Sequence, residues 1–186
     1  MTVGVHPAMD EVDYVHYKLI RQNIVTFMGK CGDQYDRDGL MLLDIAPENH
    51  EGAAPFFPKA TIETLDIDTG AKTTYCADLC ENNVAFVPHN HFDVVVCTEV
   101  LEHVKQPFHA VDEIRRMLKP DGLALVTVPF DFFIHEPRPD CWRFTEDGLK
   151  VLFSEKRGFE LLNMDALVNN GRERMPLAYS MVARKK

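Results

Sequence analysis

Residues 92–129 read FDVVVCTEVLEHVKQPFHAVDEIRRMLKPDGLALVTVP, and this stretch indicates how the chain folds. The apolar run at 94–97 is too short for a buried helix and rich in β-branched residues, so it predicts a strand covered on both faces. Pro107 suits a first helical turn, residues 119–122 end that helix, and residues 123–128 predict a second buried strand. The apolar positions at helical spacing are Phe108, Val111, Ile114, Met117 and Leu118.

Strand, helix and strand in this order form a crossover unit, whose two strands are parallel. In an open parallel sheet the ligand lies at the carboxyl ends of the strands. Those ends are Cys97, Thr98 and Glu99 after the first strand, and residues 129–131 after the second. We therefore expect the functional site at these two strand ends.

The composition fits one compact α/β domain. The chain has 186 residues, of which 46% are hydrophobic and 26% charged, which is enough for a sizeable core. The net charge is -9, and the basic residues are scattered apart from residues 184–186, so we expect no nucleic-acid partner. No apolar stretch approaches the ~20 residues that a membrane helix needs, so we expect no membrane partner. The oligomeric state stays unknown.

The amino-terminal residues and the cysteines indicate the compartment. Residues 1–17, MTVGVHPAMDEVDYVHY, lack the cationic end and apolar core of a secretory signal. The chain has five cysteines, an odd number, which argues against a disulfide framework and for reduced thiols. We therefore expect a cytoplasmic protein.

Further periodic stretches complete the predicted pattern. Acids at positions 10, 11 and 13 suit the first turn of a helix, and short apolar runs predict additional strands. Glycine and proline between residues 48 and 60 leave room for one short helix at most, so the first crossover is abbreviated. The expected elements are helices over 9–29 and 148–155, and strands over 40–47, 61–66, 72–75, 158–162 and 177–183.

Residues 131–145, DFFIHEPRPDCWRFT, have neither helical nor strand periodicity. A loop of this length in a compact domain is usually functional or disordered, and its aromatic content argues against disorder. We expect this loop to contact the substrate.

Acids follow successive strand ends: Asp44, Asp66 and Asp78, with Glu99 after the central strand. A carboxylate after a second strand can accept from both hydroxyls of a ribose, and the next acid along the sheet edge can accept from an adenine amino group. Any one of these acids alone is more often a solvated carboxylate or a helix cap. Their shared position after successive strands predicts an adenosine site.

The residues from 40 to 160 resemble a class I S-adenosylmethionine-dependent methyltransferase of the small, stand-alone methyltransferase-domain type. The resemblance is most specific in Ala77-Asp78-Leu79, in residues 92–129 and in HEPRPDCWRFTEDGL, residues 135–149. It implies a single-domain, doubly wound, mostly parallel α/β sheet of the seven-stranded, Rossmann-like methyltransferase type, with an antiparallel edge strand. The single domain 1–186 would divide into a covering helix and connector (1–39), a cofactor-binding core (40–130) and a substrate loop with the final strands (131–186).

The resemblance also implies S-adenosylmethionine as the cofactor. Asp66, with Asp68 as a competitor, would bind the ribose hydroxyls. Asp78 and Leu79 would hold the adenine. The residues near the methionine portion would be Cys97, Thr98 and Glu99.

One turn departs from the family pattern, in which a D/E-x-G-x-G-x-G segment follows the first strand and lets the backbone approach the cofactor. Asp44 matches the acid, but Ala46 stands at the first glycine position, Pro47 removes a backbone donor, and Gly52 is displaced. We assign Asp44 and Ala46 to the cofactor site. One alternative is a non-catalytic or regulatory domain with a degenerate site. Another is a nicotinamide-dependent oxidoreductase, which the missing GxGxxG weakens.

Methyl transfer mainly requires alignment of a nucleophile with an already activated methyl group, and a hydroxyl acceptor also benefits from a base. His135 in the loop and His103 at the start of the helix are the predicted catalytic residues, because histidine titrates in the useful range. The alternatives are a surface histidine at 135 and a helix-packing histidine at 103. We predict methyl transfer to a small-molecule acceptor, with oxygen slightly favoured.

Four loop residues are candidates for contacting the substrate: Arg138, Asp140, Trp142 and Arg143. Trp142 would either wall a pocket or clamp the loop onto the sheet. The two arginines would either bind an anionic substrate through forked hydrogen bonds or pin the loop through a salt bridge with Asp140. The sequence leaves these alternatives open.

No metal site is predicted. His89 and His91, and likewise Cys76 and Cys80, do not match a recognised zinc spacing, and solvated turn residues are the better interpretation. A metal-dependent O-methyl transfer, with carboxylates holding magnesium, has no clear triad in the sequence.

Overall fold

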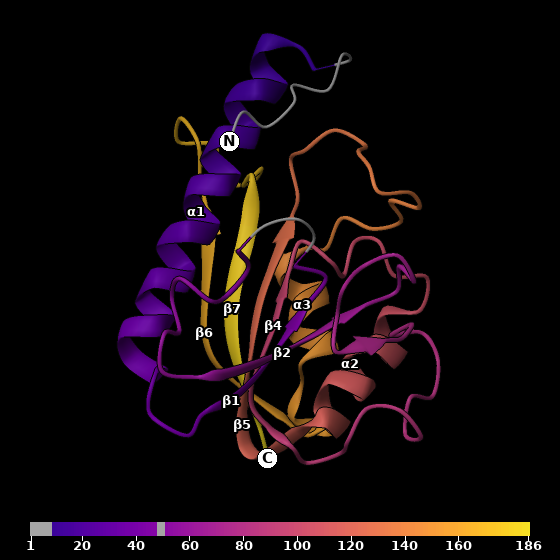
Figure 1. Cartoon of the computed structure of the whole chain (residues 1–186). Helices are drawn as coiled ribbons and strands as arrows, with labels where there is room; N and C mark the ends of the chain where they lie inside the picture. Colours follow the sequence, from indigo (N-terminus) through magenta and orange to yellow (C-terminus); the bar gives the residue numbers. More distant parts are fainter. Residues whose placement is uncertain (1–8, 48–50) are drawn as a thin grey trace.

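The computed structural model describes residues 9–47 and 51–186, which form one seven-stranded sheet with helices on both faces (Figure 1). Helix α1 covers one face, and α2 and α3 lie against the other (Figure 1). The elements are α1 (Glu11–Tyr35), β1 (Met41–Ile45), β2 (Thr61–Asp66), β3 (Tyr75–Cys76), β4 (Phe92–Thr98), α2 (Pro107–Met117), β5 (Leu118–Pro129), α3 (Glu146–Leu152), the 3-10 helix η1 (Glu155–Arg157), β6 (Phe159–Leu167) and β7 (Ala178–Lys185).

The sheet has the strand order β3-β2-β1-β4-β5-β7-β6. Strands β1 to β5 pair in parallel, whereas β7 pairs antiparallel with both β5 and β6. The predicted doubly wound, mostly parallel α/β fold is therefore confirmed. The antiparallel strand is β7, which lies one strand in from the edge strand β6.

The connection from β1 to β2 is short, as the glycine and proline residues predict. In its described part, residues 46–47 and 51–60, the chain forms turns and no helix. Phe57 of this segment is 1% exposed and packs in the cluster beneath α1. In the first crossover, side chains from turns therefore cover the sheet where a helix would otherwise pack.

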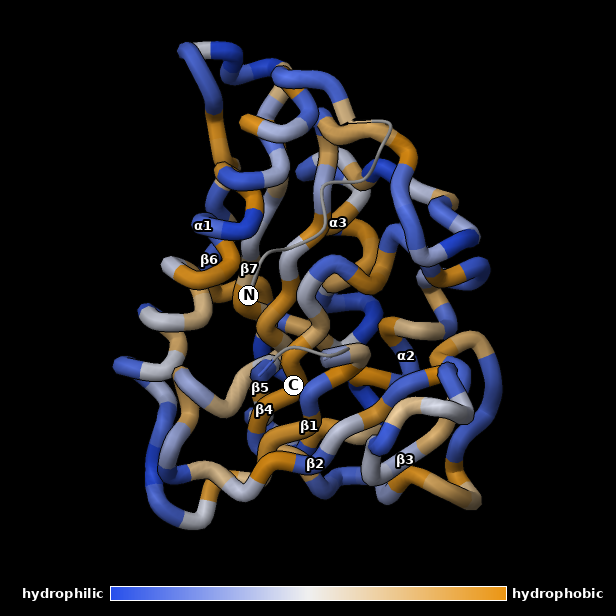
Figure 2. The backbone as a smooth tube through the Cα atoms, turned by 45° about the horizontal axis from the view of Figure 1, so that its top comes forward, coloured by the Kyte–Doolittle hydropathy of each residue, from blue (hydrophilic) through white to orange (hydrophobic). Residues whose placement is uncertain are grey.

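Strand β4 is buried on both faces, as its apolar run predicts. Side chains alternate along a strand, so Val94 and Val96 pack on the side of α1, and Val95 and Cys97 pack on the side of α2. All four are at most 2% exposed. Figure 2 shows that apolar residues are concentrated along β1, β4 and β5 in the middle of the sheet.

Helix α2 begins at Pro107 and buries Ala110, Val111 and Ile114 completely. Phe108, expected on the apolar face, is instead 50% exposed, and the guanidinium of Arg157 lies 5.1 Å from the centre of its ring. That expectation was wrong because position 108 lies at the edge of the buried stripe of this helix.

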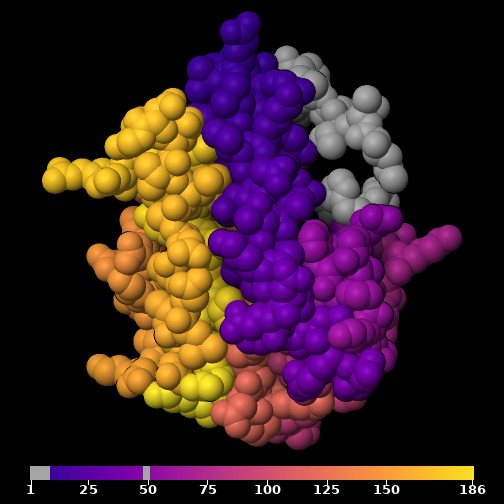
Figure 3. All heavy atoms as spheres, turned by 90° about the vertical axis from the view of Figure 1, so that its left-hand side faces the viewer, coloured from indigo at the N-terminus to yellow at the C-terminus, as the bar shows by residue number. Residues whose placement is uncertain are grey.

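Helix α1 is longer than the predicted 9–29 segment. Its start is fixed by a capping box in which Asp10 and Asp13 exchange side-chain and backbone hydrogen bonds. The first turns extend past the sheet, so Val12 and Val15 of the apolar stripe are exposed (Figure 1). Figure 3 shows the rest of α1 lying across the sheet face. Among the described residues, no helix is both long and apolar enough to span a membrane.

Strand β5 begins at Leu118, five residues before the predicted start at 123. Residues 119–122 end α2 as expected, yet they stay in the sheet. The register between β4 and β5 shifts between Phe92 and Val94, and Asp121 adopts a positive φ of 63°. An irregular strand start therefore accommodates the proline and glycine. Strands β6 and β7 extend to Leu167 and Lys185, beyond the predicted ends.

Candidate active site

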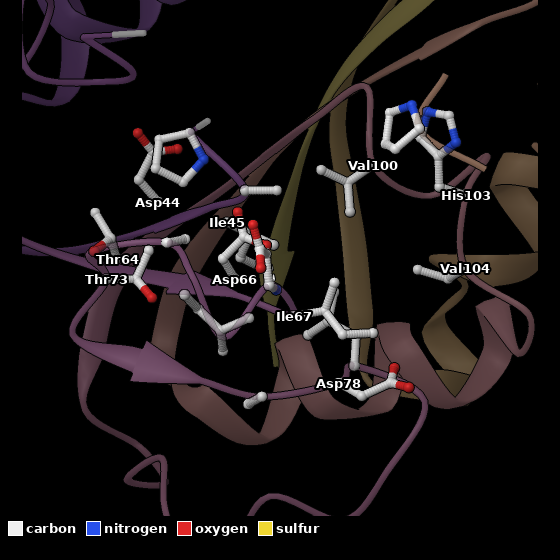
Figure 4. A pocket seen from close by; sticks show the side chains of 18 of the residues that line it. Asp44, Ile45, Thr64, Asp66, Ile67, Thr73, Asp78, Val100, His103 and Val104 are labelled. Atoms are coloured by element: carbon white, nitrogen blue, oxygen red, sulfur yellow. Dashed lines mark hydrogen bonds between the residues drawn. The ribbon is translucent and has the colours of Figure 1, made fainter. Parts of the chain in front are cut away.

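A cavity of about 1180 Å³, which we call the main cavity, lies at the carboxyl ends of β1, β2 and β4. Figure 4 shows Asp44, Asp66 and Asp78 on the side of the first three strands, and His103 on the side of the turn before α2. The predicted site residues on its wall are Asp44, Ala46, Asp66, Asp68, Asp78, Leu79, Glu99, His103 and Arg138.

The acids after β2 and β3 are oriented by their own turns. Oδ1 of Asp66 accepts a hydrogen bond from the backbone N–H of Asp68 at 2.8 Å, and Oδ1 of Asp78 accepts one from Cys80 at 2.7 Å. Oδ1 of Asp68 likewise accepts from the N–H of Gly70 at 2.8 Å. Each carboxylate is therefore held in a fixed direction at the cavity wall.

The turn after β1 is organised around Asp44, whose Oδ2 accepts a hydrogen bond from the N–H of Ala53 at 2.7 Å. Burial raises the pKa of Asp44 to about 6, although the Ala53 hydrogen bond works in the opposite direction. Gly52 has φ 56°, and a Cβ there would overlap Oδ2 of Asp44. The displaced glycine thus lets the backbone approach this acid.

Ala46 adopts φ 51°, the left-handed conformation that glycine takes at least cost. The alanine therefore keeps a glycine-like backbone at the position where the family pattern has its first glycine. Residues 48–50 of this turn lie outside the described residues.

The structure separates the three residues at the end of β4. Cys97 is completely buried in the core on the α2 side and lines neither cavity, so the structure does not bring its side chain to the other predicted site residues. Burial also raises the pKa of its thiol. Thr98 lines a smaller adjacent cavity of about 160 Å³, together with Arg21 of α1.

Glu99 lies on the wall between the two cavities and lines both. Its Oε1 accepts a hydrogen bond from Oγ1 of Thr127 at 2.9 Å. Burial raises the pKa of this carboxyl, while the Thr127 hydrogen bond opposes that change. Glu99 has φ 54°, a strained backbone conformation of the kind that gathers at functional sites.

The long loop 131–145 is docked onto the turn that follows β4. The backbone N–H groups of Cys141 and Trp142 both donate to the carbonyl of Glu102, at 2.7 and 3.1 Å. Nε1 of Trp142 donates to the carbonyl of Val104 at 2.8 Å. Trp142 is absent from the walls of both cavities, so the geometry favours the clamp over the pocket wall.

Asp140 and Arg143 are engaged with each other inside the loop. Both carboxylate oxygens accept from the guanidinium, with Nη2 2.7 Å from Oδ2. Burial alone would raise the pKa of Asp140, but the Arg143 guanidinium and the N–H of His135 lower it to about 2. Nη2 of Arg143 also donates to the carbonyl of Phe133 at 2.9 Å. This pair pins the loop, whereas Arg138 is exposed and lines the cavity.

The two predicted catalytic histidines lie together, with ring centroids 4.9 Å apart. His103 lines the main cavity from the turn before α2, not from the start of the helix as expected. His135 lies behind it and does not line the cavity. Nδ1 of His103 is 3.0 Å from the carbonyl of Pro139, and Nδ1 of His135 is 3.2 Å from Oδ2 of Asp140.

Glu102 completes this group and was missed from the sequence. Its side chain is fully buried, and burial, with the neighbouring Glu99 adding to the effect, raises its pKa. Oε1 lies 3.7 Å from Nε2 of His103 and 4.0 Å from Nε2 of His135. The run Glu-x-x-Glu-His at residues 99–103 was the available signal, because it places a second carboxylate directly beside a histidine.

Comparison with known sequences gives one consistent family. The family model described as "Methyltransferase domain" matches residues 27–163. A ubiquinone biosynthesis O-methyltransferase of Proteus mirabilis is 41% identical over 56 residues, which are 30% of this chain and 22% of that protein. The match therefore spans less than a quarter of the length of that relative.

Solved structures share the fold at low sequence identity. A SAM-dependent methyltransferase of Methanosarcina mazei has a TM-score of 0.64 at 16% identity, covering 82% of this chain and 95% of the other. The 1,6-didemethyltoxoflavin-N1-methyltransferase of Burkholderia thailandensis, solved with bound 1,6-didemethyltoxoflavin and S-adenosylhomocysteine, has a TM-score of 0.61 at 16% identity. The alignment covers 98% of this chain and 93% of the other. These structures support the same sheet architecture.

Proposed function

This chain belongs to the methyltransferase domain family, and we propose that it transfers a methyl group from S-adenosylmethionine to an oxygen of a small-molecule acceptor. The observation that carries this proposal is the cavity of about 1180 Å³, whose wall holds an oriented acid after each of the first three strands. Its position at the carboxyl ends of parallel strands is the usual ligand site of such sheets.

The adenosine end of the cofactor would lie against β2 and β3. Asp66 would accept from the two ribose hydroxyls, with Asp68 within the same wall as its competitor. Asp78 would accept from the adenine amino group, and Leu79 would contact the ring. A carboxylate already fixed by a backbone hydrogen bond loses little freedom on binding, which favours affinity.

The methionine end would lie toward β1 and β4. Ala46 keeps the backbone of the turn in a glycine-like conformation, which supports close approach of the cofactor despite the altered pattern. Thr98 and Glu99 would lie near the sulfonium, and a carboxylate there favours the positive charge of the bound cofactor.

The reaction itself needs alignment and the loss of one proton. The acceptor O–H bond breaks, the oxygen forms a bond to the methyl carbon, and the carbon–sulfur bond breaks with its electron pair staying on sulfur. His103 lines the cavity close to where that proton would leave, which supports a hydroxyl acceptor. The name of the relative from Proteus mirabilis, an O-methyltransferase, supports the same choice.

The proposal is tested with methyl-labelled S-adenosylmethionine and a panel of hydroxylated and amino-bearing aromatic and aliphatic acceptors. We expect label to pass to a hydroxylated acceptor, with one S-adenosylhomocysteine formed per methyl transferred. Transfer only to nitrogen would contradict the choice of oxygen. Cofactor binding without transfer to any acceptor would instead favour the non-catalytic alternative.

A further inference from the structure

The group Glu102, His103 and His135, which we call the Glu-His-His cluster, has no assigned role beyond that of the histidines as candidate bases. One ligand atom from each of the three residues lies within 4.8 Å of the other two, and Oε1 of Glu102 faces Nε2 of both histidines. We infer that this cluster binds a divalent transition-metal ion at the wall of the main cavity.

Nδ1 of each histidine ring, on the side away from Glu102, already faces an acceptor within the protein. Nε2 of each ring is therefore the nitrogen left to bind an ion. Nδ1 of His103 faces the carbonyl of Pro139 at 3.0 Å. Nδ1 of His135 faces the carbonyl of Phe133 at 3.3 Å, and Oδ2 of Asp140 lies 3.2 Å from the same nitrogen. A carbonyl and a carboxylate can only accept, so each Nδ1 donates, and Nε2 of each ring can coordinate an ion through its lone pair in the neutral form. Metal-binding histidines are usually oriented by such an acceptor behind the ring.

Glu102 provides an independent observation that points to a cation. Its side chain is 0% exposed, and neither carboxylate oxygen has a hydrogen-bond partner among the described residues. Buried carboxylates are normally paired or hydrogen-bonded, because the isolated charge is costly. A cation between this carboxylate and the two ring nitrogens would satisfy all three groups at once.

The spacing suits one ion after a small adjustment. Atoms that each lie about 2.1 Å from a tetrahedral ion are about 3.4 Å apart. The distances from Oε1 of Glu102 are 3.7 and 4.0 Å. The two ring nitrogens lie within 4.8 Å of each other, so side-chain rotations that move each atom by less than about 1 Å would bring all three into coordination.

The donor set selects the type of metal. Two imidazole nitrogens and one carboxylate oxygen favour first-row transition metals over magnesium and calcium, which prefer oxygen ligands. Three protein ligands leave at least one coordination position open. His103 lines the cavity while Glu102 and His135 lie behind it, so the open position lies on the cavity side.

The role of the ion rests on the proposed function. An acceptor hydroxyl in the open position would be acidified by the metal, and the oxygen would be held for attack on the methyl carbon. Its O–H bond would break with the proton leaving to solvent, because His103 would then bind the ion and not act as the base. The acceptors would then be small molecules with a hydroxyl group that can reach the metal. Metal binding itself does not depend on this role.

The test is calorimetric titration of chelator-treated, dialysed full-length protein with Mn²⁺, and with Mg²⁺ for comparison. Mn²⁺ is chosen because the chain has five free cysteines, whose thiols would capture softer ions such as Zn²⁺. We expect one Mn²⁺ per chain, bound more tightly than Mg²⁺. Glu102→Gln and His135→Ala should each weaken binding by more than about 10-fold, and the exposed His89→Ala should match the wild type.

Absence of Mn²⁺ binding in folded wild-type protein would overturn the inference, and so would equal affinity in the wild type and both cluster variants. Circular dichroism of each variant establishes that it is folded, and the wild-type titration stands even if one variant is not. Titration of the same samples with S-adenosylhomocysteine separates the two proposals. Cofactor binding without metal binding contradicts only the metal site, whereas metal binding without cofactor binding contradicts only the proposed function.

Discussion

The two sides of the main cavity satisfy their charged groups in different ways. On the side of β1 to β3, Asp44, Asp66 and Asp78 each accept a hydrogen bond from a nearby backbone N–H, at 2.7, 2.8 and 2.7 Å. On the side of β4, the carboxylate of Glu102 has no hydrogen-bond partner among the described residues, and two imidazoles turn ring nitrogens toward it. The carboxylates of the first side are therefore paired by the protein itself, whereas Glu102 on the second side would gain a partner from a bound cation.

The two sides also differ in which parts of the chain hold their side chains in place. The acids of the first side are held by turns within ten residues of them, so their geometry survives with the local backbone. The second side exists only because the loop 131–145 docks on the turn after β4 and brings His135 to Glu102. Perturbing the loop should therefore damage the second side and leave the first side intact.

The largest effect is expected where the loop is pinned. Arg143→Met would leave the carboxylate of Asp140, whose side chain is 1% exposed, without its cation. Removing one partner of a buried pair costs about 3 kcal/mol of unfolding free energy, which urea denaturation at pH 7 would measure. The matched control is Arg138→Met, whose ion pair with Glu136 is 61% exposed on both sides and should change stability by less than about 0.5 kcal/mol. Equal losses of unfolding free energy in the two variants would contradict the role of Arg143 in pinning the loop.

The next largest effect concerns the cofactor side. Asp66→Ala should remove two charge-assisted hydrogen bonds to the ribose, each worth about 1.5 kcal/mol, and so weaken S-adenosylhomocysteine binding by about 100-fold. Calorimetric titration measures this affinity. Glu81→Ala, an exposed acid away from both cavity walls, should bind like the wild type. Wild-type affinity in Asp66→Ala would remove the ribose assignment.

A smaller effect follows from the buried acid of the first turn. Burial raises the pKa of Asp44 to about 6, above the value of about 3.9 in an unfolded chain. Between these values the folded state binds the proton more tightly, so stability rises as the pH falls and is lost as the pH rises through 6. The unfolding free energy of the wild type minus that of Asp44→Asn should increase by about 2 kcal/mol from pH 7 to pH 4. Urea denaturation at both pH values that gives a constant difference would contradict this account.

The smallest effect tests whether the backbone of the turn after β1 is strained at Ala46. Ala46 has φ 51°, which costs an alanine roughly 1–2 kcal/mol, while a glycine adds back roughly 0.5–1 kcal/mol of unfolded-state entropy. Ala46→Gly should therefore stabilise the protein by about 0.5 kcal/mol, as measured by urea denaturation. Ala54→Gly, whose φ is not positive, should destabilise it. A loss of stability in Ala46→Gly would show that the turn is not strained.

The first side of the cavity could be predicted from the sequence because its geometry is local. A strand end fixes where the next residue lies, so Asp66 and Asp78 could be placed on one sheet edge from the order of strands alone. The burial of the Cys97 side chain away from both cavities could have been predicted from the alternation of side chains along its strand. Side chains alternate along β4, and Cys97 shares the buried α2 face with Val95.

The second side could not be assembled from the sequence. The contact between Glu102 and His135 joins residues 33 positions apart, and it depends on a loop without any periodicity. The pairing of Asp140 with Arg143, and not Arg138, likewise follows from how the loop closes on itself. The division of the chain into covering, cofactor and substrate segments stays a prediction.

The central claim is that the acids after the first three strands hold S-adenosylmethionine. The most direct measurement is calorimetric titration of the full-length wild-type protein with S-adenosylmethionine and S-adenosylhomocysteine, with NAD as the control. We expect one site per chain for each adenosyl ligand and no binding of NAD. Absence of binding by both adenosyl ligands, in protein that circular dichroism shows to be folded, would contradict the central claim.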